Sequence, residues 1–307
     1  MAYRLNLHES PGAALRDVAA QQLDSALAEL RGETGATPDK AVHQARKSLK
    51  KTRALLRLAR PALGNKAYAR ENAALRDAAR LLSGTRDADV LRATTAALAE
   101  RYVGHVPAAT FEALETAFAA QVVAERATAD GSAPAAEAAA MIVAARERLP
   151  SWPLDAARPK DLIAALRRTY ARGQAQLAAV DAQPSVEAIH DWRKRVKDLW
   201  YQQRLLHDAW PCVLSAQAEE AGKLGEMLGD DHDLAVLVER LRDPALPVAA
   251  DLGPVVDAAE ARRAELLDEA LRLGARLYAE PPKAFTARTR AYLDLALQES
   301  ADAGAAR

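Results

Sequence analysis

Apolar residues recur every three or four positions along nearly the whole chain, with polar residues between them. The first such stretch carries Leu15, Leu23 and Leu30 at this spacing, which places them on one side of an α-helix. No run alternates in the manner of a strand or concentrates β-branched residues. The helical pattern covers residues 12–30, 39–60, 66–83, 87–103, 107–130, 134–148, 159–179, 185–208, 212–228, 232–242, 252–278 and 282–300. The sequence therefore predicts an all-α fold of about 10–12 helices.

Proline residues lie between these stretches or at their ends, where they interrupt no predicted helix, and most glycines lie there too. Ser10 and Pro11 form a helix start, with a capping side chain followed by a proline whose missing N–H costs nothing there. Residues 150–159 make the best internal boundary, and residues 244–254 are predicted to form a loop. We expect residues 301–307 to be a frayed tail.

The chain repeats itself. A shift of 147 residues places His43 on His190 and carries the helix before it onto a matching helix. Downstream, residues 82–91 match residues 228–237 at a shift of 146. Such a period indicates an internal duplication. We therefore expect a single domain over residues 1–307, built from repeat 1 (about 1–149) and repeat 2 (about 155–300) as two antiparallel helical bundles related by an approximate two-fold axis.

Composition narrows the class of protein. The 307 residues are 50% hydrophobic and only 5% aromatic, and 42 Lys and Arg balance 42 Asp and Glu. The chain is thus predicted to be folded, and its surface is not uniformly basic, although a local basic site remains possible. Cys212 is the single cysteine, so no internal disulfide forms, and we expect a buried thiol in a reducing cytoplasm. No stretch has the apolar length of a membrane span.

One predicted helix has a polar face of a single charge sign. From Lys40 to Arg60 there are eight basic residues and no acid. On a helical projection, six polar residues fall within about 80° of one line. Like charges one turn apart repel, so this face indicates either an anion-binding site or a solvated face with internal pairing. The residues of the stripe are His43, Arg46, Lys47, Lys50, Arg53 and Arg57, with Lys51 beside them.

The second repeat keeps the stripe although its helix also contains acids. Lys51 and Arg53 are replaced by Asp198 and Trp200, whereas the other basic positions are retained. Solvation alone would not require the same positions twice, so the two stripes could face each other across one groove. The retained residues are His190, Arg193, Lys194, Lys197 and Arg204.

The residue types indicate what such a groove would hold. Arginine offers a planar fork to phosphate or carboxylate oxygens, and lysine offers a mobile charge. Cations spaced by about 5.4 Å per turn suit a ligand with repeated negative charge. The histidines are expected to resist protonation beside so many cations. Each is either a neutral donor to a phosphate oxygen or a packed residue near a helix start.

The segment from Asp230 to Asp233 invites a metal-site interpretation, because carboxylates and imidazole bind divalent ions. The alternative, which we favour, is a helix N-terminus with capping acids, and no metal is predicted. We expect Asp87 and Asp233 to pair with the basic helices and so support the anion site. Secondary candidates for the groove wall are Arg76, Arg86 and Lys223.

At these residues the sequence resembles the CHAD family, the conserved histidine α-helical domain. The matching pieces are the His-x-x-Arg-Lys-x-x-Lys patterns that begin at His43 and His190, and the acidic segments at Arg86-Asp87 and His232-Asp233. The resemblance covers essentially the whole chain and is that of a stand-alone member. It implies two helical bundles around a basic central pore that binds inorganic polyphosphate. Trp200 and Asp198 depart from the family's pattern, where basic residues are frequent.

The leading hypothesis is therefore non-enzymatic polyphosphate binding, without a cofactor, by a cytoplasmic protein with no membrane partner. A nucleic-acid binder could use the same basic residues, but aromatic residues do not punctuate the stripe. An enzyme acting on phosphoanhydrides would need a positioned metal or nucleophile. A scaffold that coats granules or recruits proteins is the remaining alternative.

Overall fold

A computed structural model describes residues 3–82, 87–128 and 132–305 and confirms the all-α prediction. The described ranges contain ten α-helices, two short 3₁₀ helices and no strand. Helix η1 (Leu149–Ser151) lies in the linker before residue 159, and η2 (His207–Ala209) precedes α8. The α-helices are α1 (Pro11–Leu30), α2 (Pro38–Leu81), α3 (Asp87–Arg101), α4 (Ala108–Thr128), α5 (Ser132–Arg148), α6 (Pro159–Ala182), α7 (Val186–Leu205), α8 (Pro211–Leu241), α9 (Gly253–Leu277) and α10 (Pro282–Ala305).

The helix starts follow the local chemistry of the sequence. At α1, the Ser10 hydroxyl accepts a hydrogen bond from the Ala13 backbone N–H at 3.3 Å, and Pro11 occupies the first turn. At α7, the Ser185 hydroxyl accepts one from Ala188 at 3.1 Å. Each cap satisfies a backbone donor that has no partner within the helix.

Helix α2 contains two arms that fold back on each other at Gly64. Gly64 has a φ of 74° and a ψ of 163°, a conformation in which a residue without a Cβ is favoured. Arg46 donates to the carbonyl of Leu82 at 3.2 Å, and Arg53 donates to Asn72 Oδ1 at 3.1 Å. Residues so far apart in sequence could not meet along one straight helix, since each adds about 1.5 Å of length. The two arms correspond to the two helices predicted there.

Helix α8 corrects the prediction for residues 228–232. The helix is continuous through this segment, so the interpretation of Asp230–Asp233 as capping acids at a helix N-terminus is wrong. Glycine at position 229 leaves room for Arg193 of α7, whose Nη2 would lie 2.8 Å from a Cβ there. Asp231 is buried and pairs with Arg263 of α9 at 3.1 Å.

Two further expectations differ from the structure. Cys212 was expected to be buried, but it is exposed in the first turn of α8. Helix α10 continues to Ala305, which makes residues 301–305 helical where a frayed tail was expected. As predicted, a linker separates α5 from α6 and a loop separates α8 from α9, and this loop ends before residue 253, where α9 begins.

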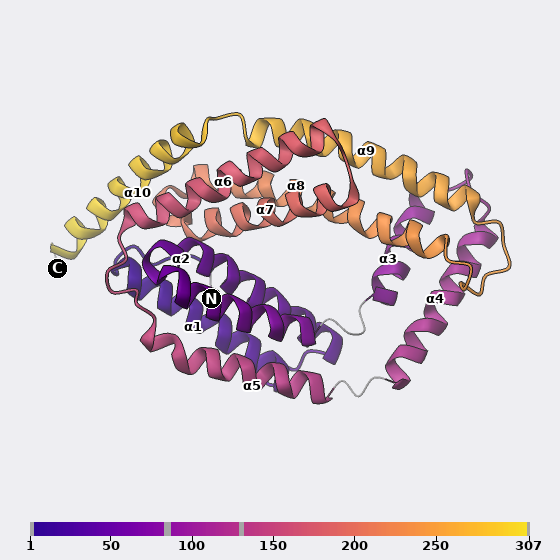
Figure 1. Cartoon of the computed structure of the whole chain (residues 1–307), viewed down its shortest axis with the longest axis horizontal. Coiled ribbons are helices and arrows are strands. Elements are labelled where there is room, and N and C mark those ends of the chain that lie inside the picture. Colours follow the sequence, from indigo (N-terminus) through magenta and orange to yellow (C-terminus); the bar gives the residue numbers. More distant parts are fainter. Residues whose placement is uncertain (1–2, 83–86, 129–131, 306–307) are drawn as a thin grey trace.

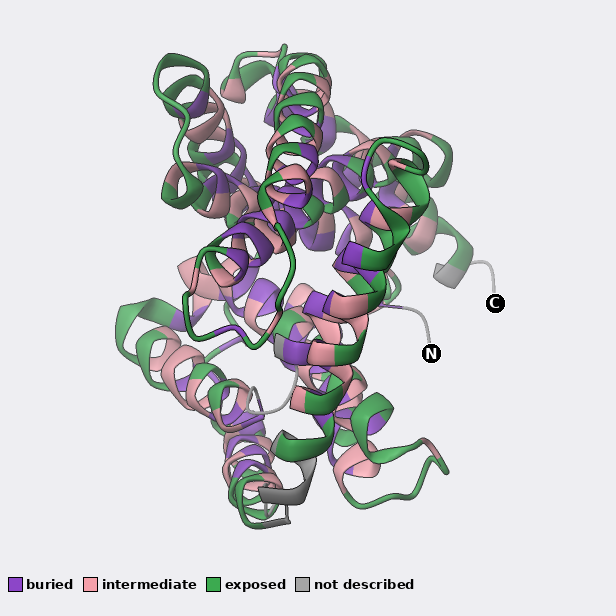
Figure 2. Cartoon of the chain, turned by 90° about the vertical axis from the view of Figure 1, so that its right-hand side faces the viewer, coloured by how far each residue is buried: buried purple, intermediate pink, exposed green. Residues whose placement is uncertain are grey.

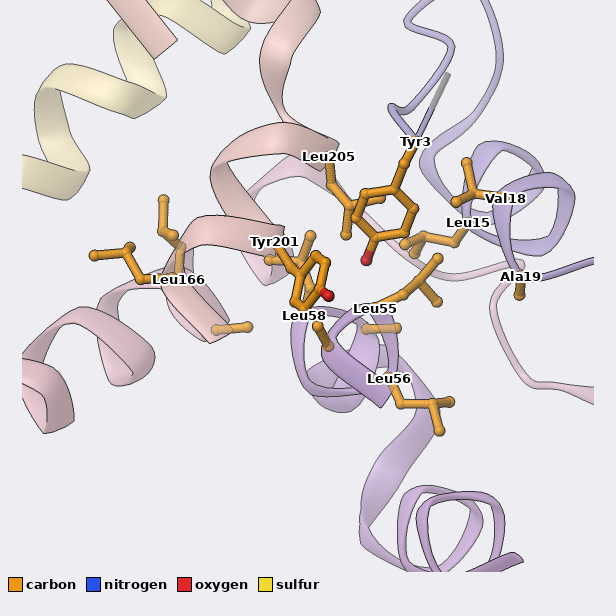
Figure 3. Close-up of a cluster of buried hydrophobic side chains, with 14 of the residues drawn as sticks. Tyr3, Leu15, Val18, Ala19, Leu55, Leu56, Leu58, Leu166, Tyr201 and Leu205 are labelled. Atoms are coloured by element: carbon orange, nitrogen blue, oxygen red, sulfur yellow. The ribbon is translucent and has the colours of Figure 1, made fainter. Parts of the chain in front are cut away.

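The helices form two groups that share one hydrophobic core. Helices α1, α2 and α5 lie together, and α6–α10 lie across from them (Figure 1). Buried residues run through the interior of both groups (Figure 2). Figure 3 shows Leu55 and Leu58 of α2 between Leu15 of α1 and Leu166 of α6. Packing of α2 against α6 and α7 thus fixes one group relative to the other.

The hairpin of α3 and α4 belongs to the first half of the sequence but packs on the second half. Its residues Leu98 and Phe118 join Leu237 of α8 and Val255 of α9 in a separate hydrophobic cluster. The hairpin therefore lies against α8 and α9 at one end of the molecule (Figure 1). None of the helices in the described ranges combines the length and apolar composition that crossing a membrane requires.

Candidate anion-binding site

The cations of α2 lie along its first arm, and their side chains are either exposed or half-buried. His43, Lys47 and Lys50 are exposed. Arg46 and Arg53 are half-buried because each reaches across to the second arm of α2, where it donates a hydrogen bond to Leu82 and Asn72 respectively. These hydrogen bonds hold the side chains of Arg46 and Arg53 in fixed positions on the first arm. The four lysine and arginine side chains named here, together with Lys51 and Arg57, are called the α2 cations below, and His43 lies on the same arm.

The cations of α7 are more buried and more constrained. Lys194 is exposed and pairs with Asp191 at 2.8 Å. The Lys197 ammonium lies 4.7 Å, and the Arg204 guanidinium 5.0 Å, from the ring centroid of Trp200. Trp200 thus takes part in the site as an aromatic surface for two cations. Together with Arg193, these three cations are called the α7 cations, and His190 lies on the same helix.

A stripe of glycines on α8 accommodates the α7 cations. A Cβ placed at Gly225 would lie 2.8 Å from Lys197 Cε, and one at Gly229 would lie 2.8 Å from Arg193 Nη2. At Gly222, the nearest atom would be Trp200 Nε1 at 3.3 Å. Because these positions carry no side chain, the long side chains of α7 lie flat against α8.

The α2 and α7 cations meet where the two helices pack. Arg57 of α2 pairs with the buried Asp198 of α7 at 3.1 Å. Nearby, Lys51 and Arg204 both lie over the Tyr3 ring, at 5.5 Å and 5.9 Å from its centroid. The Tyr3 hydroxyl donates to the Lys51 carbonyl at 2.7 Å, which holds the N-terminal segment against both helices (Figure 3).

Burial and mutual repulsion lower the pKa of several of these cations. Burial lowers the pKa of Lys51, with further contributions from Arg204 and Lys47. Burial also lowers the pKa of Lys197, helped by Arg193 and opposed by Glu226 and Asp230. Positive charge is therefore held here at an electrostatic cost, which a bound anion would relieve.

The histidine of α7 is held neutral by the same causes. Burial lowers the pKa of His190, followed by the charges of Lys194 and Arg193 and by His232. The His190 and His232 rings lie 4.6 Å apart. His190 can thus donate a hydrogen bond to an anion as a neutral side chain, one of the two roles predicted from the sequence.

The acids expected to support the site have different positions. Asp233 forms no ion pair among the described contacts and lines a cavity of about 520 Å³ with Arg101 and Arg262. The charge of the neighbouring Asp230, together with that of Glu226, opposes the lowering of the Lys197 pKa, and burial raises the pKa of Asp230 against the effect of Arg193. Arg86 and the side chain of Asp87 lie outside the described residues.

The two remaining secondary candidates already have acidic neighbours. Arg76 donates to Asp77 at 2.9 Å, and Lys223 pairs with Glu219 and Glu220 at 3.0 Å and 2.7 Å. Both cations are about half exposed. The charge of Arg76 still helps to lower the pKa of Arg53. The charge of Lys223, in contrast, is balanced by the two glutamates of its own helix.

Metal binding receives no geometric support in the described part of the chain, where no three His, Cys, Asp or Glu side chains gather as a metal site would require.

Sequence analysis missed Arg195, which pairs with Asp198 at 3.1 Å, and Asn72, which orients Arg53. It also interpreted Asp198 and Trp200 only as departures from a basic pattern. Their roles depend on neighbours distant in sequence, so no local signal could have identified them.

Comparison with known proteins identifies the family of this chain. A search of curated proteins gives no match. The family model described as the CHAD domain matches residues 17–242. This range includes both α2 and α7 with all their cations, and it covers most of the chain. The chain therefore belongs to the CHAD-domain family.

Proposed function

We propose that this protein binds inorganic polyphosphate along the α2 and α7 cations, as a binding module that catalyses no reaction. CHAD domains are associated with polyphosphate binding. The observation that carries the proposal is the meeting of cations from two helices at Lys51 and Arg204, where burial and repulsion lower the pKa of Lys51. A chain with repeated negative charge would contact successive turns of both helices.

We further propose that the site is built from two duplicated halves. At the shift of 147, Arg57 corresponds to Arg204, and Lys51 corresponds to Asp198. Arg57 forms an ion pair with Asp198, and the charge of Arg204 lowers the pKa of Lys51. In a two-fold arrangement each contact is repeated with its partners exchanged, and these two contacts have that relation. Because Asp198 stands where the first half has Lys51, the contact with Arg57 is attractive. The corresponding contact between Lys51 and Arg204 joins two cations and is repulsive.

The cytoplasm is the compartment that we propose for this function. The only cysteine, Cys212, has no partner for an internal disulfide, and the structure is stabilised by packing and ion pairs. An example is the buried Glu71 of α2, which accepts two hydrogen bonds from Arg148 of α5 at 3.0 Å and 2.9 Å. Such a fold does not depend on an oxidising environment.

Charge removal on both helices tests the proposal. The double variant Lys50→Glu/Lys197→Glu should lose binding of labelled long-chain polyphosphate and keep its helical circular dichroism. Lys197→Glu places a new carboxylate near Glu226 and Asp230, so Lys50→Met/Lys197→Met serves as a neutral version. The matched control is Lys160→Met/Lys283→Met, which removes two exposed lysines at the starts of α6 and α10.

Unchanged affinity in both double variants would contradict the assignment. Equal binding of orthophosphate and long chains to the α2 and α7 cations would contradict an extended site. Preferential binding of RNA or DNA in a competition experiment would favour the nucleic-acid alternative, and release of orthophosphate with Mg²⁺ present would favour an enzyme.

A further inference from the structure

A small cavity between α2, α6 and α7 is lined by arginines and by no acid. Its volume is about 190 Å³, and its five arginines come from three helices: Arg57, Arg60, Arg168, Arg172 and Arg195. Tyr68 completes one wall. Of these residues, only Arg57 belongs to the α2 cations that the sequence pattern identified. We name this cavity the arginine pocket.

Three of the five guanidinium groups are held in place by the protein itself. Arg57 and Arg195 each lie 3.1 Å from a carboxylate oxygen of Asp198, whose exposed fraction is 7%. Arg60 donates to Asn65 Oδ1 through Nε at 3.1 Å and Nη2 at 2.9 Å, and its guanidinium lies 4.7 Å from the Tyr68 ring centroid. Such preorganised donors lose little freedom when a ligand binds.

The charge of the pocket is not balanced from within. In the part of the chain that the structure describes, Asp198 is the one carboxylate paired with its arginines, and burial raises the Asp198 pKa against the effect of Arg57, Arg195 and Arg172. Arg168 and Arg172 of α6 are exposed, and within the described residues neither makes an ion pair. These two side chains are thus available at the opening of a pocket that retains excess positive charge.

The size and donor set of the pocket select a compact oxyanion. A volume of about 190 Å³ is that of about six waters at ~30 Å³ each, which accommodates one tetrahedral oxyanion. Guanidinium groups bind phosphate oxygens in pairs. A terminal phosphate carries about −1.5 to −2 charge near neutral pH, more than an internal unit of a linear chain, so it gains more from a cluster of arginines.

We propose that the arginine pocket is a second anion site, specific for a phosphate group with two ionisable oxygens. Free orthophosphate and the end group of a linear polyphosphate share this chemistry. The polymer form of the proposal rests on the proposed function: the α2 and α7 cations hold the body of the chain, and the pocket holds its end. The orthophosphate form is independent of that function.

Titration with inorganic phosphate tests the pocket directly. Wild-type protein should bind one phosphate, measured by calorimetry, and Arg168→Ala/Arg172→Ala should weaken this binding by about tenfold or more, because two charged donors are lost. Both arginines are exposed, so the fold should be retained. The matched control is Arg167→Ala, which removes an exposed arginine of the same helix that does not line the pocket.

The outcomes separate the pocket from the proposed function. No saturable binding up to about 10 mM phosphate, or an equal loss in Arg167→Ala, overturns the pocket. The Lys50→Met/Lys197→Met variant should have a dissociation constant for inorganic phosphate within about twofold of the wild-type value. If phosphate binds as described but long chains do not bind the α2 and α7 cations, the proposed function fails and the pocket stands.

A comparison of free and end-blocked chains tests the polymer form. Linear polyphosphate with both ends blocked as alkyl esters should bind wild-type protein more weakly than the unblocked chain. The Arg168→Ala/Arg172→Ala variant should bind the two chains equally. Equal binding of both chains by wild-type protein overturns the end-group proposal, whatever the result with orthophosphate.

Discussion

Individual residues acquire their roles in this protein from partners that are far away in sequence. Asp198 replaces a basic residue of the repeat pattern, yet it pairs with Arg57 and Arg195 in the interior. Trp200, which aligns with Arg53 in the sequence pattern, lies beneath Lys197 and Arg204. Both substitutions reduce the number of positive charges while fixing the positions of those that remain.

His190 leads to a prediction about pH. Because burial and nearby cations lower its pKa below the usual 6.5, the folded protein binds fewer protons than the unfolded chain between the two pKa values. Stability therefore falls as pH decreases through 6.5 toward the lowered pKa. A polyanion bound beside His190 would raise the pKa again, so binding should take up protons and become tighter in this range.

Calorimetry at about pH 6 in buffers of different ionisation enthalpy measures that proton uptake. Long polyphosphate chains are the ligand, because few of their groups are terminal. His190→Gln should reduce the uptake, whereas His105→Gln, at the exposed turn between α3 and α4, should leave it unchanged. The same uptake in His190→Gln as in wild type would show that the anion does not reach this histidine.

At the scale of elements, the glycine stripe of α8 determines how the α7 cations lie. Gly225→Ala should not reduce stability, since alanine favours a helix over glycine by about 0.5–1 kcal/mol and the new Cβ meets only the flexible end of Lys197. It should lower polyphosphate affinity several-fold, because the Lys197 ammonium is displaced from Trp200. Thermal unfolding and a binding titration on one preparation measure both effects.

Gly274→Ala is the contrasting variant. Its Cβ would lie 2.6 Å from Cζ2 of the fully buried Trp192, which cannot move freely, so overpacking should cost about 1–3 kcal/mol. Polyphosphate affinity should change little while the protein remains folded. Wild-type affinity in Gly225→Ala would mean that the position of Lys197 against α8 does not matter for binding.

Across the whole molecule, zero net charge coexists with a concentrated basic region. The 42 basic and 42 acidic residues are unevenly placed, so the α2 and α7 cations and the arginine pocket stand out on a neutral protein. Such a surface should attract a polyanion locally and not over its whole area.

The salt dependence of binding measures this local charge. A plot of log K against log salt concentration should have a negative slope of about 0.7 per phosphate contacted. Lys50→Met/Lys197→Met should reduce its magnitude by about 1.4, for two lost contacts, and Lys160→Met/Lys283→Met should not change it. Identical slopes in the wild type and the first variant would remove both lysines from the site.

Most of the fold could be predicted from the sequence, and the exceptions have physical causes. The spacing of apolar residues and the placement of prolines are local, so they gave the helices, the linker before residue 159 and the loop before α9. The break expected near Gly229 was wrong, because the packing of Arg193 against this glycine is a tertiary contact. The position of the α3–α4 hairpin on α8 and α9 was equally invisible in local periodicity.

The sequence by itself determined that two helices carry matching rows of cations, because charge and helical phase are properties of neighbouring residues. Only the tertiary structure decided which cations meet. Asp198 and Arg57 are 141 positions apart, and the five arginines of the pocket come from three helices. Their convergence depends on how hydrophobic faces pack, which burial of apolar surface across the whole chain decides.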